Sequence, residues 1–346
     1  MAVWFLTLIG AFWLVVSIMA SPTSRDLDGL SIKEGFIPFS HPSLSSDVSA
    51  QIFYRVAGDL EGGSRPLVAL HGGPGFSSLY LQPTLDLLSI KTGQPVVYFD
   101  QFGSGNSTHY REKRLDQGFW TIELFESQIE TVLRHFDIAD AFDLYGHSWG
   151  AMLAAHFAGL YKPAGLKQLI LASGLASTKA AKESFNQLVS TLPDKIQEAL
   201  RTAPPESDAY GEAIDLFYHR FVCRADPWPP ELVETFARSE EDDTVYLTMW
   251  GPNELDVEGN LKSYDTSDLC KNINVPTLII SGEYDELQPV ASRAWVDGIS
   301  DREVVIVPNG SHLAGLEYPE IYVGHIASFL QQARHCDPSN QIELRV

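Results

Sequence analysis

Basic residues are scarce in this chain of 346 residues. Its 24 lysines and arginines are outnumbered by 45 aspartates and glutamates, which gives a formal net charge of −21 at pH 7. Binding to DNA or RNA needs a basic surface that can neutralise phosphates, so this balance argues against a nucleic-acid partner. The acidic surface instead fits a soluble protein that weakly attracts cationic ligands.

Metal-binding patterns are also missing. The ten histidines show no His-Glu-x-x-His spacing, and Cys223, Cys270 and Cys336 are not paired at the spacing of a zinc finger. Three cysteines allow one disulfide at most, and reduced buried thiols are equally compatible with the sequence. We therefore expect no metal site, and the chemistry derived below needs no organic cofactor.

Charge is absent from residues 2–20, which end in a run of small residues at Ala20. This pattern predicts a secretory signal peptide over residues 1–20, cleaved after Ala20. The apolar run is long for a signal and just reaches the length of a transmembrane span, so an uncleaved membrane anchor is the alternative. The third interpretation is that the start of the chain is misassigned. The first interpretation predicts a secreted protein, and only the second predicts contact with a membrane.

Short apolar runs alternate with helical patterns through most of the chain, as in the helical spacing of residues 121–135. Continuously apolar runs of this length are typical of buried parallel strands. Their alternation with helices predicts an α/β fold with a mostly parallel central sheet and helices on both faces. The predicted strands are residues 51–56, 66–70, 95–99, 142–145, 169–173, 276–281 and 304–308.

The alternation stops between about residues 177 and 265, where helical patterns dominate and no clear strand occurs. This change predicts a helical cap inserted into an α/β-hydrolase core. The predicted boundaries are 21–175 for the first part of the core, 176–265 for the cap, 266–335 for the second part of the core and 336–346 for a C-terminal tail.

The segment around Ser148 has the pattern Gly-x-Ser-x-Gly, between a strand-like run and a run of helix formers. Such a turn exposes a serine hydroxyl and leaves little room for neighbouring Cβ atoms. We predict that Ser148 is a nucleophile; the alternative is an inert turn serine. Its oxyanion would be met by the backbone N–H groups of Trp149 and of Gly73, which lies in a second glycine-rich loop after a strand. A plain turn is the alternative for that loop.

Serine becomes a good nucleophile when a histidine takes its proton and a carboxylate orients that histidine. Asp285 and His312 each follow a predicted strand, and reactive groups collect at the carboxyl ends of parallel strands. The order Ser148, Asp285, His312 is the order found in α/β-hydrolases. The sequence therefore predicts a catalytic triad.

Several motifs together resemble the prolyl iminopeptidase family of serine α/β-hydrolases. They are His-Gly-Gly-Pro-Gly at residues 71–75, Asp-Gln-Phe-Gly-Ser-Gly-Asn-Ser at 100–107 and Gly-His-Ser-Trp-Gly at 146–150. Met-Trp-Gly-Pro-Asn-Glu at residues 249–254 and Gly-Glu-Tyr-Asp-Glu at 282–286 are more similar to the tricorn-interacting aminopeptidase branch. The resemblance extends from about Gly35 to about Gln332. Phe102 and Leu255 depart from the family pattern, so a first-residue range broader than proline stays open.

The resemblance implies that Glu254 and Glu286 bind the free α-amine of the substrate, with help from Tyr246. It also implies a serine aminopeptidase that forms an acyl-enzyme and acts on short peptides or aminoacyl small molecules. Two alternatives from the sequence are an amidase or ester hydrolase dedicated to one small metabolite, and an inactive homologue that only binds a ligand.

Two N-glycosylation sequons begin at Asn106 and Asn309. The second lies three residues before His312, where a glycan would block the predicted site. We therefore expect Asn309 to be unmodified.

Overall fold

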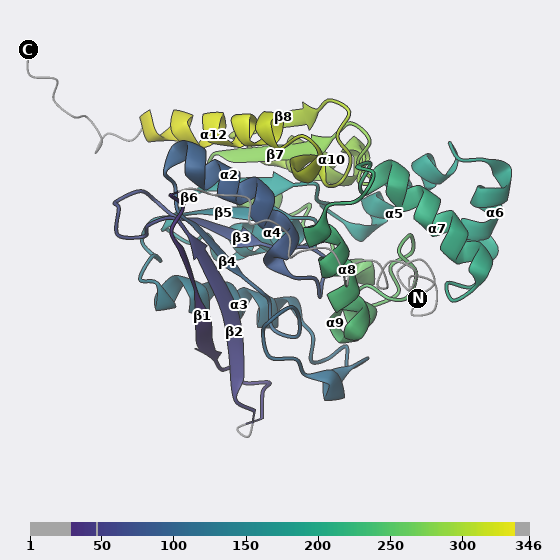
Figure 1. Cartoon of the computed structure of the whole chain (residues 1–346), viewed down its shortest axis with the longest axis horizontal. Coiled ribbons are helices and arrows are strands. Elements are labelled where there is room, and N and C mark those ends of the chain that lie inside the picture. Colours follow the sequence, from purple (N-terminus) through teal and green to yellow (C-terminus); the bar gives the residue numbers. More distant parts are fainter. Residues whose placement is uncertain (1–28, 46–47, 336–346) are drawn as a thin grey trace, which may run out of the picture.

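The computed structural model describes residues 29–45 and 48–335 (Figure 1). The predicted signal peptide or anchor at residues 1–20, the tail at 336–346 and Cys336 lie outside the described residues. Within the described part of the chain, no helix combines the length and apolar character needed to cross a membrane.

The sheet has eight strands in the order β1-β2-β4-β3-β5-β6-β7-β8. β1 and β2 are antiparallel to their neighbours, and the strands from β4 to β8 run parallel to one another. This arrangement confirms the predicted mostly parallel sheet. The strands are β1 (Ile32–Phe39), β2 (Ala50–Ala57), β3 (Leu67–Leu70), β4 (Val96–Phe99), β5 (Phe142–His147), β6 (Leu166–Ala172), β7 (Thr277–Gly282) and β8 (Arg302–Val307).

Helices cover both faces of this sheet. Tyr145 of β5 contacts Tyr322 of α12 through their hydroxyls, 3.0 Å apart, whereas the next residue, Gly146, packs against the backbone of α4. Because successive strand residues point to opposite faces, α12 and α4 must cover opposite faces. The core helices are α2 (Gln82–Thr92), α3 (Ile122–His135), α4 (Trp149–Tyr161), α10 (Pro289–Gly298), α11 (Ala314–Glu317) and α12 (Pro319–His335).

A group of helices between β6 and β7 lies to one side of the sheet (Figure 1). A single antiparallel bridge between Ser177 and Asp265 joins the points where the chain leaves and re-enters the core. We call residues 178–264 the cap. Its α-helices are α5 (Thr178–Val189), α6 (Asp194–Thr202), α7 (Asp208–Phe221), α8 (Pro230–Glu241) and α9 (Thr244–Met249).

Single-turn 3-10 helices connect some of these elements. They are η1 (Ser78–Leu81), η2 (Arg111–Lys113), η3 (Asn260–Ser263) and η4 (Cys270–Asn272). Three of the helices begin where a hydroxyl accepts a hydrogen bond from the first turn: Thr121 precedes α3, Ser177 precedes α5 and Ser207 precedes α7. Each of these residues supplies a partner to an N–H group that the helix itself cannot satisfy.

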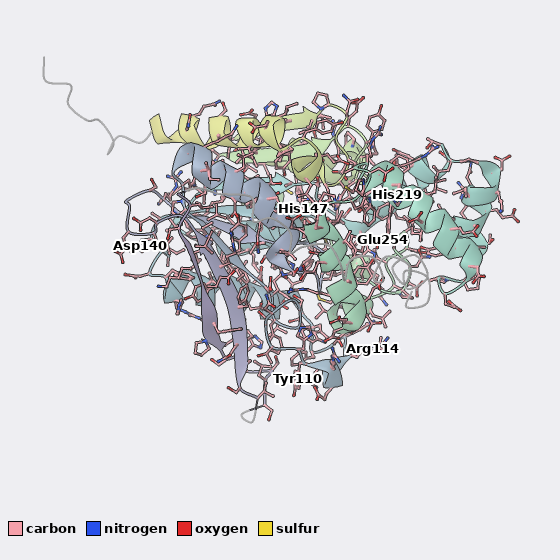
Figure 2. All side chains as sticks on the ribbon, viewed as in Figure 1. Tyr110, Arg114, Asp140, His147, His219 and Glu254 are labelled. Carbon is pink, nitrogen blue, oxygen red and sulfur yellow. The ribbon has the colours of Figure 1, made fainter. Side chains whose placement is uncertain are left out.

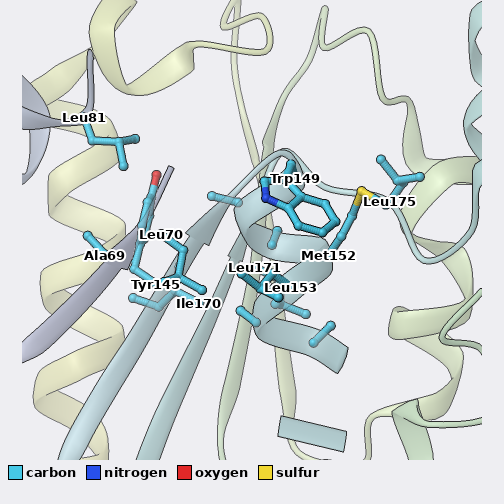
Figure 3. Close-up of a cluster of buried hydrophobic side chains, with 14 of the residues drawn as sticks. Ala69, Leu70, Leu81, Tyr145, Trp149, Met152, Leu153, Ile170, Leu171 and Leu175 are labelled. Atoms are coloured by element: carbon cyan, nitrogen blue, oxygen red, sulfur yellow. The ribbon is translucent and has the colours of Figure 1, made fainter. Parts of the chain in front are cut away.

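A cluster of fully buried side chains lies around β5 and α4. Leu153 of α4 is fully buried together with Leu70 and Ile170 of the neighbouring strands, and Trp149 begins the helix on the same cluster (Figure 3). The indole Nε1 of Trp149 donates to Gln101 at 2.8 Å, so the buried ring leaves no polar atom unmatched. The turn that carries Ser148 therefore rests on fully buried, closely packed side chains.

Candidate active site

Ser148 occupies a strained turn between β5 and α4. Its φ and ψ are 57° and −120°, a conformation that side-chain-bearing residues rarely adopt. A Cβ at Gly146 would lie 2.1 Å from the carbonyl oxygen of Gly150, and a Cβ at Gly150 would lie 2.2 Å from that of Leu70. Both glycines are thus required by close backbone packing, which holds Ser148 at the carboxyl end of β5.

Two backbone segments that could supply oxyanion donors lie beside Ser148. Trp149 is the first residue of α4, where N–H groups have no carbonyl of the preceding turn to bond. Gly73, in the loop after β3, has φ 111° and lines the same recess as Ser148 and His312. At Gly72 an added Cβ would lie 3.0 Å from the Cβ of Ser148, so this loop approaches the serine closely.

Asp285 and His312 are in direct contact. The Nδ1–H of His312 donates to Oδ1 of Asp285 at 2.9 Å, and the same oxygen accepts from the backbone N–H of Leu287 at 2.8 Å. Asp285 is fully buried and His312 is 5% exposed. This contact assigns the proton to Nδ1 and leaves Nε2 directed into the cavity that Ser148 also lines.

The charge state of His312 is set by competing effects. Burial alone would lower its pKa, but the negative charges of Asp285 and Glu286 outweigh burial and raise the pKa to about 9. Glu286 is buried, and its Oε1 lies 3.7 Å from Nε2 of His312. Burial, opposed by His312, raises the pKa of Glu286 to about 8. His312 therefore holds its proton more tightly than an ordinary histidine does.

Glu254 reaches the cavity from the cap. Its Oε2 accepts hydrogen bonds from the hydroxyl of Tyr246 and, at 3.2 Å, from that of Tyr218. Burial raises the pKa of the Glu254 carboxyl, although the two tyrosine donors act in the opposite direction. Glu254 lies on the cap side of the molecule, whereas His147 lies in the core (Figure 2). The carboxylate is fixed in place by its phenol partners.

The two predicted amine-binding carboxylates line one cavity of about 460 Å³ between core and cap. Glu286 enters it from the core, and its Oε2 is buried without a hydrogen-bond partner among the described residues. Ser148, His312, Glu254, Tyr246 and Gly73 line the same space. The structure thus brings together the residues that the sequence singles out; Trp149 stands next to Ser148 through its backbone.

The end of cap helix α7 is attached to this site. The carbonyl oxygen of Phe221 accepts hydrogen bonds from the backbone N–H groups of Glu286, at 3.1 Å, and His312, at 3.0 Å. The next carbonyl, that of Val222, accepts from Leu313 at 2.9 Å. The same few hydrogen bonds therefore set both the position of the cap and the position of the loop that carries His312.

Sequence reasoning missed the buried residues that connect these parts. His71 accepts from the backbone N–H of Gln101 at 2.9 Å, and the side chain of Gln101 donates back to the carbonyl of His71 at 3.0 Å. Tyr218, whose hydroxyl donates to Glu254 at 3.2 Å, was not predicted as part of the site. Tyr80 and His147 also escaped notice. Their partners are distant in sequence, so only the presence of polar residues within motifs could have marked them.

The remaining predictions concern other side chains. Cys223 and Cys270 are buried free thiols. Asn106 and Asn309 are both exposed, and Asn309 lies in the loop that leads to His312. Among residues 29–45 and 48–335, no group of three or more histidine, cysteine or acidic side chains is placed to hold a metal ion.

Comparison with known proteins places this geometry in a family. Residues 65–319 match the family model described as alpha/beta hydrolase fold. The chain is 33% identical over 285 residues to a proline iminopeptidase of Thermoplasma volcanium, which covers 81% of this chain and 93% of that protein. It is also 33% identical over 285 residues to a proline iminopeptidase of Saccharolobus solfataricus, covering 81% and 89%.

Solved structures give the same result. The structure of VinJ has a TM-score of 0.81 at 36% identity and covers 87% of this chain and 99% of its own. The proline iminopeptidase of Mycobacterium smegmatis has a TM-score of 0.80 at 33% identity and covers 88% and 100%. Identity at this level over nearly whole chains shows common family membership, and the chain therefore belongs to the proline iminopeptidase family of serine α/β-hydrolases.

Proposed function

We propose that this protein is a serine aminopeptidase that releases the N-terminal residue from short peptides or aminoacyl amides. The observation that carries the proposal is the pair of carboxylates, Glu254 and Glu286, in the cavity that Ser148 and His312 line. Burial makes the ionised form of both carboxylates costly, and an N-terminal ammonium bound between them would favour that form by pairing with it. A blocked N-terminus or an internal peptide bond would leave both carboxylates uncompensated.

The reaction we propose proceeds through an acyl-enzyme. The Oγ of Ser148 attacks the carbonyl carbon of the first residue, and Nε2 of His312 takes the hydroxyl proton. The N–H groups of Gly73 and Trp149 hold the oxyanion. When the C–N bond breaks, Nε2 returns the proton to the leaving amine. Water then attacks the ester by the same route, with Asp285 orienting His312 in both steps.

Proline is the first residue that this receptor favours. The ammonium of an N-terminal proline is secondary and carries two N–H donors, which match one oxygen from each of the two carboxylates. A primary ammonium carries three donors, and its third could reach the hydroxyl of Tyr246, which borders the same cavity. The arrangement thus favours proline as the N-terminal residue of the substrate and also allows other N-terminal residues.

The experiment compares substrates with and without the amine. Glu254→Gln keeps size and removes charge, so KM for a prolyl amide with a free amine should rise about tenfold or more, since a charged hydrogen bond is lost. An ester that lacks the amine should react at the wild-type rate. Glu258→Gln, an exposed glutamate of the same loop, is the control. Equal losses with both substrates would assign Glu254 a structural role and defeat the proposal.

A second candidate is a hydrolase dedicated to one aminoacylated small molecule. The cavity of about 460 Å³ falls within the range that holds a drug-sized ligand. Rates for one aminoacyl group carried on leaving groups of increasing size separate the two functions. Rates that increase steeply with a bulky, non-peptide leaving group would favour the dedicated hydrolase, whereas a preference for di- and tripeptides favours the aminopeptidase.

A further inference from the structure

A chain of buried hydrogen bonds connects the loop of the oxyanion donors to the catalytic histidine. The backbone N–H of Gly72 lies 2.8 Å from the hydroxyl of Tyr80, which lies 2.9 Å from Nδ1 of His147. Nε2 of His147 lies 2.9 Å from the backbone carbonyl oxygen of His312. Gly72 adjoins Gly73, and His147 immediately precedes Ser148. The chain of bonds therefore joins the loop of Gly73, the residue before Ser148 and the backbone of His312.

The direction of each bond follows from its partners. A carbonyl oxygen can only accept, so Nε2 of His147 must carry the proton that it donates to His312. In the neutral ring Nδ1 is then an acceptor, and the hydroxyl of Tyr80 must donate to it. That leaves the hydroxyl oxygen to accept the N–H of Gly72. The N–H of Gly72, the hydroxyl of Tyr80, the ring of His147 and the carbonyl of His312 thus each have a suitable partner. Only one tautomer of His147 satisfies all of these bonds.

Burial makes this order costly to disturb. Tyr80 is 3% and His147 is 4% exposed, and Gly72 is also buried. Burial, and to a smaller extent the nearby charge of His312, lowers the pKa of His147 to about 3. The ring of His147 therefore stays neutral while His312 changes charge. The rings of His147 and His312 are in edge-on contact, with centroids 4.8 Å apart at 64°.

We propose that His147, supported by Tyr80, is a positioning residue that fixes the backbone of His312 relative to Ser148 and the oxyanion loop. The inference rests on the proposed function. His147 touches no reacting atom; it acts by holding the carbonyl of His312. Asp285 sets the ring orientation of His312 from one side, and His147 sets the main chain from the other. A histidine at the position before the nucleophile is thereby explained.

The experiment measures the rate at which a fluorophosphonate labels Ser148. His147→Leu removes the donor to the carbonyl of His312, and Tyr80→Phe removes the hydroxyl that both Gly72 and His147 need. Labelling should slow about tenfold or more in each, because a small misplacement of a catalytic group costs that much. His147→Gln should recover most of the rate, since its amide N–H can reach the same carbonyl. In His147→Leu and Tyr80→Phe, kcat for hydrolysis of a substrate should fall while its KM changes little.

Two variants control for loss of buried polar groups. Tyr145→Phe removes a buried hydroxyl from the same strand, β5, where it meets Tyr322 rather than the site. His156→Gln replaces a histidine of α4 that pairs with Glu126 at 2.6 Å. Both should label at the wild-type rate. Wild-type labelling of His147→Leu and Tyr80→Phe would overturn the proposal, as would equal slowing in the controls. The label needs no amine, so an error in the proposed substrate leaves the result readable.

Discussion

Replacing Glu286 with glutamine should move the acid limb of the pH–rate profile to lower pH. Oε1 of Glu286 lies 3.7 Å from Nε2 of His312, and both side chains are buried. Burial alone would lower the pKa of His312, but its carboxylate neighbours hold that pKa at about 9. His312 acts as a base only when neutral, so removing one carboxylate should let it lose its proton at lower pH.

The size of the effect follows from the distance. Two unit charges at this separation, with an effective dielectric constant of about 20, interact by about 4 kcal/mol, equivalent to about three pKa units. Burial, opposed by the charge of His312, raises the pKa of Glu286 itself to about 8. Glu286 is therefore ionised over only part of the pH range in which the acid limb lies. We therefore expect the acid limb to move down by at least about one pH unit.

The assay is kcat/KM against pH for an ester that has no amine, because this ratio reports the free enzyme and avoids the loss of amine binding. Glu283→Gln is the matched control, since Glu283 is an exposed glutamate of the same loop that accepts from the N–H of Asn309 at 2.8 Å. With a free-amine substrate, the acid limb of wild-type kcat should lie at lower pH, because the bound ammonium offsets the carboxylates. Coinciding limbs for wild type, Glu286→Gln and Glu283→Gln would refute the reasoning.

Three further outcomes are expected. Ser148→Ala should fold normally and lose about 10³-fold or more in kcat, and a rate above about a tenth of wild type would remove Ser148 from the chemistry. Gly150→Ala should lower the free energy of unfolding in urea by about 1–3 kcal/mol or more, because its Cβ would meet the carbonyl of Leu70 at 2.2 Å; an unchanged midpoint would contradict this. Asp86→Asn should cost about 3–5 kcal/mol in the same assay, since Asp86 makes two 2.7 Å bonds to the buried guanidinium of Arg55; a loss below about 1 kcal/mol would show that the pair is unimportant.

The parallel strands β3 and β4 could be predicted because they are apolar and buried along their whole length. β5 is equally buried although it contains Asp143 and His147, and the glycine-rich turn that follows it marks its position. β1 escaped prediction for the opposite reason. It is an edge strand that contains Gly35 and Pro38 and leaves Phe36 half exposed, so its pattern is neither apolar nor cleanly alternating.

The placement of Ser148, Asp285 and His312 after strands was predictable because glycine patterns and strand ends mark it. The contacts that hold these residues in place were not predictable. Tyr218 meets Glu254 from 36 residues away, and His147 meets the carbonyl of His312 from 165 residues away. Such contacts depend on how the cap folds over the core and on which face of a strand a residue occupies. No local periodicity encodes either, although His147 lies inside the Gly-His-Ser-Trp-Gly motif.

The shared carbonyl of Phe221 has a mechanical consequence. A swing of the whole cap as a rigid body would break the bonds that hold Glu286 and His312 and would displace the base. The opposite side of the cap has its own attachments: His109 lies 2.5 Å from Asp242, and the backbone N–H of Leu115 donates to the hydroxyl of Thr248 at 2.8 Å. The cap is therefore held to the core on both sides, and at the end of α7 a single carbonyl joins it to the backbone of both Glu286 and His312. A substitution that shifts the end of α7 would consequently move Glu286 and His312 together rather than one at a time.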